Sequence, residues 1–263
     1  MLACGTIELP ISKGDKLSKK QCPKNDLERD AMKDKPYASL VGSLMYAQVC
    51  TRPDLAFTIS VLGRFQSNAR KAHWNAGMRV LRYLQKTKSH MLVYRKTDHL
   101  VLEGYSDSDF AGGPNDLKSN PGYVFMMVVE VVSWRSVKQD TVASTTMVAE
   151  YLSCCEVVNQ AVWLKNFITG LHVVDSISRP MQFYFDNNAA IFFTKNNKRS
   201  NATRNLDIKF LVAHGKVMEG LVKIDYLETS LMIAGPLNKV VPAVVFKKHV
   251  KKMGVLADFD VEE

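Results

Sequence analysis

Two aspartates, Asp107 and Asp109, stand at a place in the sequence where a metal ligand could be held. Residues 100–105 alternate in the manner of a strand, and residues 112–116 form a cluster of Gly, Pro, Asn and Asp that is typical of a turn. A carboxylate at such a strand end is fixed by rigid backbone and still faces solvent, which suits metal binding. Aspartate is also common beside turns without any metal, and this stretch taken alone favours that plainer interpretation.

Two further carboxylates could complete a metal centre. Residues 181–186 predict a second strand that ends in Asp186. Glu150 lies in a helical stretch, residues 145–167, that we expect in two pieces. If the two aspartate strands lie side by side, Asp107, Glu150 and Asp186 can converge. Oxygen ligands with little His or Cys nearby suit Mg²⁺ or Mn²⁺ and not Zn²⁺. Such a cluster can hold two metal ions roughly 4 Å apart for phosphodiester hydrolysis.

The elements that must position these residues fall into two parts. The second part mixes strands and helices, which predicts a mixed α/β fold. Its strands are expected at 100–107, 122–132, 132–138, 181–186 and 221–227, and its helices at 145–167, 187–193, 206–219 and 243–253. The first part is weakly patterned up to residue 36, with one helical turn expected over 26–32, and then mostly helical, at 37–48, 51–65 and 72–86. We expect the helix at 37–48 to be buried, and Thr51 to cap the next one, with Pro53 in its first turn.

The charge distribution points to a polyanionic partner. The net charge is +9, but residues 1–99 hold 18 Lys and Arg against 8 Asp and Glu, whereas residues 100–263 hold 17 against 18. The basic excess therefore belongs to the first part, and nucleic acid is the obvious partner. A merely solvated basic face is the alternative, although such faces usually mix both signs.

The helix expected at 72–86 is the best candidate for that contact. Arg79, Arg82 and Lys86 share one face with Tyr83 beside them, and basic residues with interleaved aromatics can follow a phosphate backbone and stack on bases. Tyr83 could equally belong to the core, as Trp74 more strongly does. The predicted buried stripe of this helix is formed by four apolar residues: Trp74, Met78, Leu81 and Leu84.

Composition excludes several classes of protein. With 263 residues and 46% hydrophobic residues, the chain can bury the core of one large domain or two smaller ones. It has no run of about 18 apolar residues and no signal-peptide pattern, so we expect no membrane partner. Five cysteines without metal-site spacing indicate free thiols in a reducing compartment, cytoplasmic or nuclear.

Several motifs, in the same order, resemble the end of the reverse transcriptase and the ribonuclease H domain of copia-type LTR retrotransposon Pol polyproteins. The first group lies at 36–46, 51–54, 72–74 and 81–84, and the second at 104–112, 132–136, 149–151 and 186–187. The resemblance covers about residues 13–254. It implies a basic helical reverse-transcriptase remnant over 1–97 and a ribonuclease H-like domain over 98–255 with a mixed five-stranded sheet flanked by helices. The residues at 256–263 are acidic, and we expect them to form a frayed tail.

The resemblance also implies an activity. In that family the ribonuclease H domain cuts the RNA strand of an RNA–DNA hybrid with a divalent metal, Mg²⁺ or Mn²⁺. The catalytic, metal-holding carboxylates map to Asp107, Glu150 and Asp186, and Asp109 is given no role. The catalytic aspartate pair of the polymerase is not among these residues, so DNA synthesis is not expected. The implied partners are an RNA–DNA hybrid and the missing polymerase part of the polyprotein.

One departure from the family pattern bears on the site. A fourth carboxylate is expected within Ala-Asp-Pro-Leu-Thr-Lys, but residues 234–239 are Ala-Gly-Pro-Leu-Asn-Lys, which puts Gly235 at that position. Val148 likewise replaces an acid. We therefore expect a weak or inactive ribonuclease H. The alternatives are a non-catalytic nucleic-acid-binding remnant, in which the basic first part binds, and a relic without a role that leaves its apolar helix at 37–48 exposed.

Overall fold

The fold is built around one mixed sheet. The computed structural model describes residues 5, 7–15, 17–96, 101–109, 118–139, 146–171, 180–188, 191 and 207–257. Its strands are β2 (Leu102–Asp109), β3 (Asn120–Met127), β4 (Glu130–Ser136), β5 (Met181–Phe185) and β6 (Val222–Tyr226), in the spatial order β4-β3-β2-β5-β6. β2, β3 and β4 pair antiparallel, whereas β5 runs parallel to both β2 and β6. The expected mixed five-stranded sheet is confirmed.

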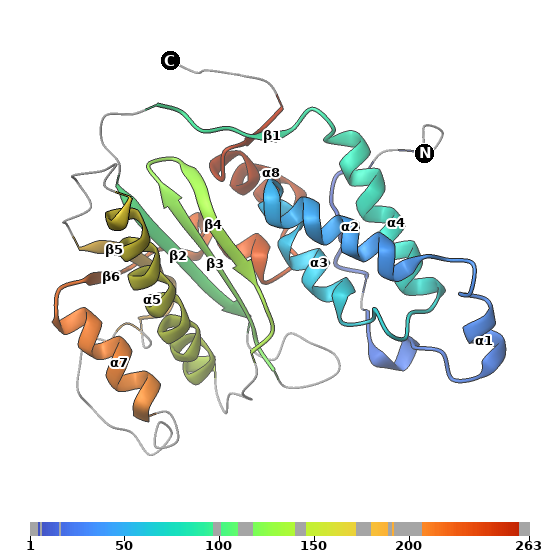
Figure 1. Ribbon diagram of the computed structural model, residues 1–263, viewed down its shortest axis with the longest axis horizontal. Helices are drawn as coiled ribbons and strands as arrows, with labels where there is room; N and C mark the ends of the chain where they lie inside the picture. Colours follow the sequence, from blue (N-terminus) through green and yellow to red (C-terminus); the bar gives the residue numbers. More distant parts are fainter. Residues whose placement is uncertain are drawn as a thin grey trace.

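Two helices cover one face of the sheet, α5 (Thr146–Gly170) and α7 (Asp207–Met218), on the left of Figure 1. Their buried side chains, such as Cys155, Val158 and Ala213, share a core with Phe125 and Phe183 of the sheet. We expected α5 in two pieces, but it is one helix of 25 residues. Its inward row is continuous, and no Gly or Pro interrupts it before its last residue.

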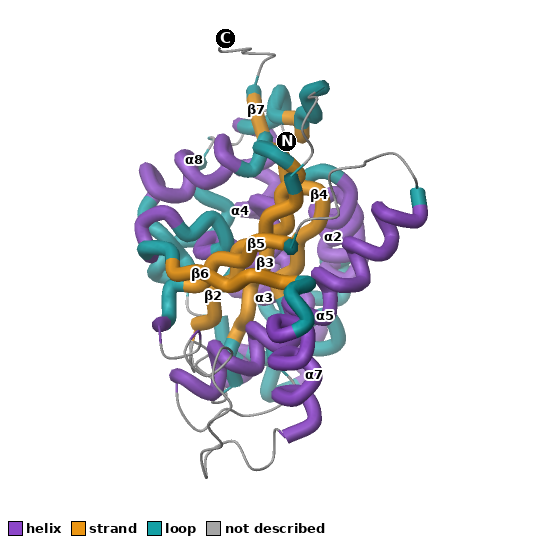
Figure 2. The backbone as a smooth tube through the Cα atoms, turned by 90° about the vertical axis from the view of Figure 1, so that its left-hand side faces the viewer, coloured by secondary structure: helices purple, strands orange, loops and turns teal. Residues whose placement is uncertain are grey.

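The helices of the first part cover the opposite face. They are α2 (Tyr37–Cys50), α3 (Ala56–Gly63) and α4 (Lys71–Lys86), joined there by α8 (Ala243–Lys252). Figure 1 shows α2, α3 and α4 together on the right, and Figure 2 shows the strands in the middle of the molecule with helices around them. Val41 and Leu62 belong to the same core as Val124 and Met126 of β3. The division at residue 97 stays a prediction, and the described residues on its two sides share one apolar core.

Short elements complete the chain. They are η1 (Lys19–Gln21), α1 (Asp26–Asp30), η2 (Pro53–Leu55), β1 (Met91–Leu92), η5 (Thr229–Leu231), η6 (Gly235–Leu237) and β7 (Val255–Leu256). β1 and β7 pair antiparallel, so Leu256, which we expected in the frayed tail, belongs to a strand. Residues 258–263, and most of the helix expected at 187–193, lie outside the described residues.

Some boundaries differ from the prediction for local reasons. The turn of the β3–β4 hairpin lies at Val128 and Val129, so Val132, the expected turn, is inside β4. Val128 has φ 65°, an unfavourable conformation for a β-branched residue. Thr51 ends α2 instead of capping the next helix, which begins after Arg52 with Pro53 in its first turn.

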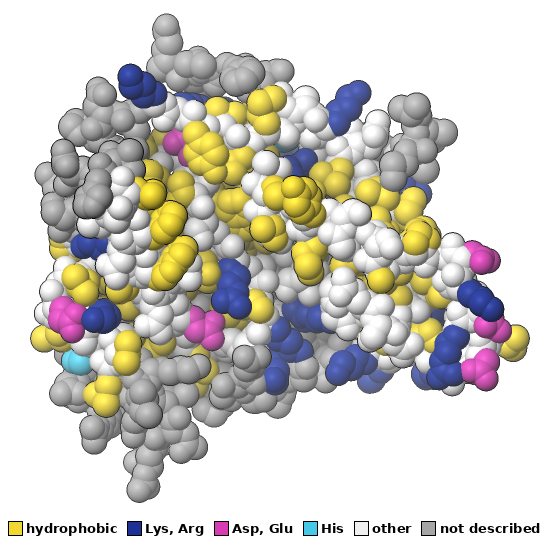
Figure 3. All heavy atoms as spheres, in the orientation of Figure 1, with side chains coloured by type: hydrophobic (Ala, Val, Ile, Leu, Met, Phe, Trp, Pro, Cys, Tyr) yellow, Lys and Arg dark blue, Asp and Glu magenta, His cyan; other side chains and the backbone are white. Residues whose placement is uncertain are grey.

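Helix α4 is buried on a face beside the predicted one, and helix α2 is less buried than expected. In α4 the buried residues are His73, Gly77, Val80 and Tyr83, and the predicted stripe lies beside them. His73 stacks on Phe65 with ring centroids 4.1 Å apart, and this contact holds the side of the helix that carries His73 toward the core. α2 buries Tyr37, Val41 and Leu44 but exposes Met45, Tyr46 and Val49, so it is only half-buried. Apolar side chains in that region are visible in Figure 3.

A buried polar network holds the start of α3 against α4. Arg52 donates two hydrogen bonds to Asp54, at 2.9 and 2.7 Å, and a third to the Thr87 hydroxyl at 2.8 Å. The Tyr83 hydroxyl donates to Asp54 Oδ2 at 2.6 Å. Arg52 and Asp54 are almost fully buried, so each charge depends on the other and on these donors. The Thr-Arg-Pro-Asp motif therefore has a structural role in this chain.

We predict that Tyr83→Phe lowers the free energy of unfolding by about 1–3 kcal/mol, because buried Asp54 loses a donor that water cannot replace. Tyr46→Phe is the matched control, since Tyr46 is 75% exposed and should change stability by less than about 0.5 kcal/mol. Urea unfolding measures both. Equal midpoints for the two variants would contradict a stabilising role for this bond.

Candidate metal centre and basic surface

Three carboxylates meet at one edge of the sheet. Asp107 is on β2, and Asp186 directly follows β5. Because β2 and β5 are parallel with Ser106 paired to Phe185, the two aspartates occupy neighbouring places just beyond that pair. Glu150 comes from the first turns of α5, whose Ser153 hydroxyl lies 2.9 Å from that of Ser106. One oxygen from each carboxylate lies within 4.8 Å of the others, so the expected convergence is observed.

Burial and repulsion between carboxylates raise the proton affinity of Glu150 and Asp186. Asp107 and Glu150 are only 2% and 4% exposed, and Asp186 is half-buried. Burial, and then the charges of Asp107 and Asp186, raise the pKa of Glu150 to about 9. Burial and Asp107 also raise the pKa of Asp186, against a hydrogen bond that the Thr229 hydroxyl donates to its Oδ2 at 3.0 Å. A cation at the cluster would relieve both effects.

The donor set fits a hard divalent cation. Glu150 Oε2 is buried and accepts no hydrogen bond from the described residues. All three donors are carboxylates, which Mg²⁺ and Mn²⁺ prefer. Asp107, Glu150 and Asp186 are therefore the residues that would hold such an ion. The side chain of Asp109 lies outside the description.

Position 235 borders this cluster. A Cβ added to Gly235 would lie 3.6 Å from Asp107 Oδ2. The approach of η6 depends on Gly122, which pairs with Asp107 across β2 and β3 and whose added Cβ would meet Leu237 Cβ at 2.9 Å. The Lys239 ammonium, four residues after Gly235, lies 2.7 Å from Asp107 Oδ2. Sequence reasoning noted this lysine within its motif but assigned it no place in the site.

Comparison with known proteins gives the family. No family model matches the chain. The chain is 37% identical over 238 residues to the retrovirus-related Pol polyprotein from transposon TNT 1-94 of Nicotiana tabacum, covering 90% of this chain and 18% of that protein. It is 31% identical to the Pol polyprotein from transposon RE2 of Arabidopsis thaliana, covering 84% of this chain and 15% of that protein.

The chain is homologous to a part of the copia-type retrotransposon Pol polyproteins.

The chain spans less than a fifth of the length of these two polyproteins. A protein named secreted RxLR effector protein 161, from Plasmopara viticola, is 46% identical over 133 residues, which are 51% of this chain and 94% of that protein. Among solved structures, an N-terminal RNase H domain from Mycobacterium tuberculosis, fused to maltose-binding protein, is similar over 58% of this chain and 98% of that chain, with a TM-score of 0.38 and 12% identity.

The basic residues of α4 in this Pol chain have acidic neighbours. Arg79 Nε lies 3.2 Å from Asp15 Oδ2, and Lys86 forms an ion pair with Glu8. Arg82 is exposed. Tyr83, which could have stacked on bases, is 3% exposed and belongs to the core. Asp15 and Glu8 both come from the segment that precedes α1, so this segment places acids on the α4 surface that we predicted to bind nucleic acid.

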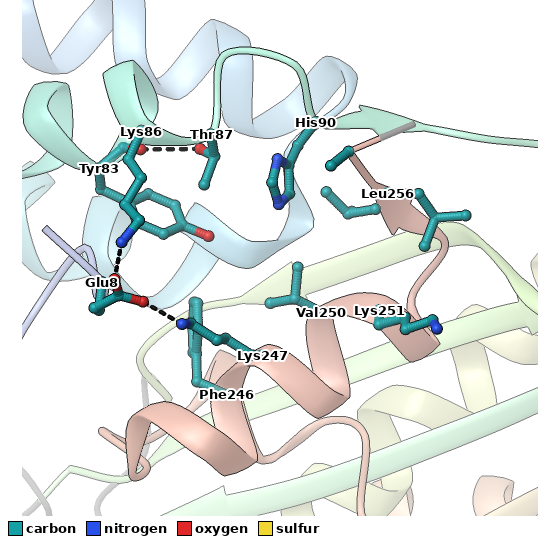
Figure 4. A pocket seen from close by; sticks show the side chains of 12 residues that line it. Glu8, Tyr83, Lys86, Thr87, His90, Phe246, Lys247, Val250, Lys251 and Leu256 are labelled. Carbon is teal, nitrogen blue, oxygen red and sulfur yellow. Dashed lines mark hydrogen bonds and ion pairs between the residues drawn. The ribbon is translucent and has the colours of Figure 1, made fainter. Parts of the chain in front are cut away.

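Helix α8 adds a basic surface beside α4. It carries Lys247, Lys248, Lys251 and Lys252 without an acidic residue. Glu8 pairs with Lys247 as well as Lys86, and Figure 4 shows it between the two lysines. A cavity of about 380 Å³ lies there, with Tyr83 and Phe246 in its wall. The sequence did not reveal the basic surface of α8, because the acidic residues elsewhere in 100–263 balance its lysines when charge is counted over that whole range.

Among the described residues, no helix combines the length and apolar character needed to cross a membrane.

We predict that without metal the stability of the Pol chain falls as pH rises. The pKa of Glu150 is about 9 in the folded state and ordinarily 4.5, so between these values the folded state keeps a proton that the unfolded state has released. Raising the pH then favours unfolding. Melting curves in EDTA from about pH 5 to about pH 8 should show this decline, and Glu150→Gln should reduce it.

Glu228→Gln is the matched control, because Glu228 is exposed and lies outside the three-carboxylate cluster. It should keep the decline of the unmodified protein. The same pH dependence in Glu150→Gln as in Glu228→Gln would contradict a proton held by Glu150.

Proposed function

We propose that this Pol chain is a divalent-metal-dependent ribonuclease H that cuts the RNA strand of an RNA–DNA hybrid, with activity weakened by glycine at position 235. The convergence of Asp107, Glu150 and Asp186 within 4.8 Å carries the proposal. The choice of a hybrid as substrate rests on the resemblance of residues 104–112 and 149–151 to the ribonuclease H domain of the family.

The side chains of the centre have distinct parts in this proposal. A bound Mg²⁺ or Mn²⁺ would supply Lewis acidity for the attacking water and the leaving oxygen. Asp107 on β2 and Asp186 just after the adjacent strand β5 would bind the metal, and the Thr229 hydroxyl orients Asp186. The raised pKa of Glu150 keeps a proton on it in the metal-free state, and a cation bound at the cluster would favour release of that proton.

Gly235 is the reason to expect weak activity. Its Cβ position is 3.6 Å from Asp107 Oδ2, so an aspartate there could reach the cluster, whereas glycine offers no ligand atom. Without this ligand the site would bind the metal more weakly and would position the attacking water and the leaving oxygen less well. The loss of one strong transition-state contact typically costs about 10²–10³ in rate.

A second candidate function is non-catalytic nucleic-acid binding. The observation that favours it is the basic surface of α4 and α8, where Lys86 and Lys247 share the single carboxylate of Glu8. Arg79, Arg82 and Lys86 would then contact phosphates, as we predicted, and the lysines of α8 would extend the contact. Both functions are compatible with one protein, because a nuclease also needs to hold its substrate.

The polymerase part of Pol is a further proposed partner. α2 exposes Met45, Tyr46 and Val49 and carries no charged residue, although one face of it packs in the core. The tobacco relative extends far beyond the length matched by this chain. The exposed apolar face of α2 is where we expect such a neighbouring part to contact this one.

The test of the nuclease is a cleavage assay on a labelled RNA–DNA hybrid, with Mg²⁺ and with EDTA. We expect slow, Mg²⁺-dependent cleavage of the RNA strand, its loss in Asp107→Asn, and a gain of up to about 10²-fold in Gly235→Asp. Asp225→Asn is the control, because Asp225 is on the same sheet and outside the cluster. Cleavage that persists in Asp107→Asn would overturn the proposal.

The test of binding is the salt dependence of hybrid affinity. Neutralising Arg79, Arg82 and Lys86 together should weaken binding and reduce the slope of log affinity against log salt by about 1 per lost phosphate contact. Glu8→Gln should strengthen binding, because it releases Lys86 and Lys247. Lys223→Gln, on β6, is the control. Affinity that does not change from about 50 to 200 mM salt would contradict this function.

A further inference from the structure

The carboxylate cluster already contains one positive charge. Lys239 Nζ lies 2.7 Å from Asp107 Oδ2, and Asp107 is 2% exposed. One oxygen of Asp107 lies within 4.8 Å of an oxygen of Glu150 and of Asp186, so this ammonium stands beside the other two carboxylates as well. Its charge therefore reaches all three acids that would hold a metal ion.

The backbone of the η6 turn brings this lysine to the cluster. The Lys239 N–H donates to the Gly235 carbonyl at 3.2 Å, which keeps the two residues one turn apart. A Cβ at Gly235 would lie 3.9 Å from Lys239 Cε and 3.6 Å from Asp107 Oδ2. Position 235 thus borders both members of the ion pair.

A divalent ion and this ammonium would compete for the same oxygen. Two cations at contact distance from Asp107 Oδ2 would repel each other strongly in a site with so little water. The lysine can give way, because its side chain is about one third exposed and has a flexible four-carbon stem. With three carboxylates and one ammonium, the cluster keeps a net negative charge that still attracts a divalent ion.

We propose that Lys239 is an internal cation that competes with the divalent metal for Asp107, so that metal binding requires displacement of its ammonium. The inference rests on the proposed metal-dependent function and adds a residue that sets the metal affinity of the centre. Lys239 is in this sense an affinity-determining residue and not a metal ligand.

The first test measures Mn²⁺ binding by titration calorimetry and by the electron paramagnetic resonance signal of free Mn²⁺. Lys239→Gln and Lys239→Met should each bind Mn²⁺ about tenfold more tightly than the unmodified protein, because the competing charge is gone. Lys239→Arg keeps the charge and should stay weak. Lys223→Gln is the matched control, because Lys223 also pairs with an aspartate, Asp225, at 3.0 Å but outside the cluster.

A second test uses the unmodified protein and does not depend on the folding of a variant. Lysines are acetylated with a water-soluble reagent, with and without Mg²⁺, and the modified peptides are quantified by mass spectrometry. We expect Mg²⁺ to increase acetylation of Lys239, because the displaced amine becomes accessible, and to leave Lys223 unchanged. Unchanged labelling of Lys239 at saturating Mg²⁺ would overturn the proposal.

The proposal for Lys239 would also be overturned if folded Lys239→Gln bound Mn²⁺ no more tightly than the unmodified protein. The absence of Mn²⁺ binding by the unmodified protein and by every variant would overturn it too. Tighter binding in Lys239→Gln without hybrid cleavage by any variant has a different meaning. That result would contradict the nuclease function but would support the competition between Lys239 and the metal.

Discussion

The parallel pairing of β2 with β5 is the constraint on which the centre depends, because it brings together two aspartates that are 79 positions apart (186 − 107). The pairing itself depends on close packing. A Cβ at Gly104 of β2 would meet the Phe183 ring of β5 at 2.0 Å, so only glycine lets this ring lie where it does. Phe183 in turn joins the core beneath α5, which carries Glu150. Within the 104–112 motif, Gly104 therefore makes room for the Phe183 ring, and Asp107 contributes a carboxylate to the cluster.

Charge compensation organises the neighbourhood of these acids. Burial, and then the repulsion from Asp107 and Asp186, raises the pKa of Glu150. Lys239 partly offsets the repulsion through its contact with Asp107. Gly122 allows the η6 turn to come this close, since a Cβ there would meet Leu237 Cβ at 2.9 Å. Gly235, the position that departs from the family pattern, lies next to both Asp107 and Lys239.

The first part of the chain is held to the sheet by apolar packing and has its own polar centre. The bidentate Arg52–Asp54 pair, closed by Tyr83 and Thr87, fixes α3 against α4, and Val80 of α4 lies in the core that includes Val124 of β3. On the outside, Glu8 and Asp15 lie against basic residues of α4 and α8. Part of the positive charge counted from the sequence is therefore paired with acidic side chains in the folded chain.

Residue order and type were enough for the family, the five strands and the three carboxylates, because alternation marks strands locally and Asp107, Glu150 and Asp186 sit within recognisable motifs. The buried face of α4 was missed by one residue, since His73 and Tyr83 are drawn inward by Phe65 and Asp54 and not by hydrophobic period. Only the tertiary structure decided that Lys239 lies on Asp107 and that Glu8 joins Lys86 to Lys247. Such pairs are far apart in the chain, and no local pattern encodes the distance between them.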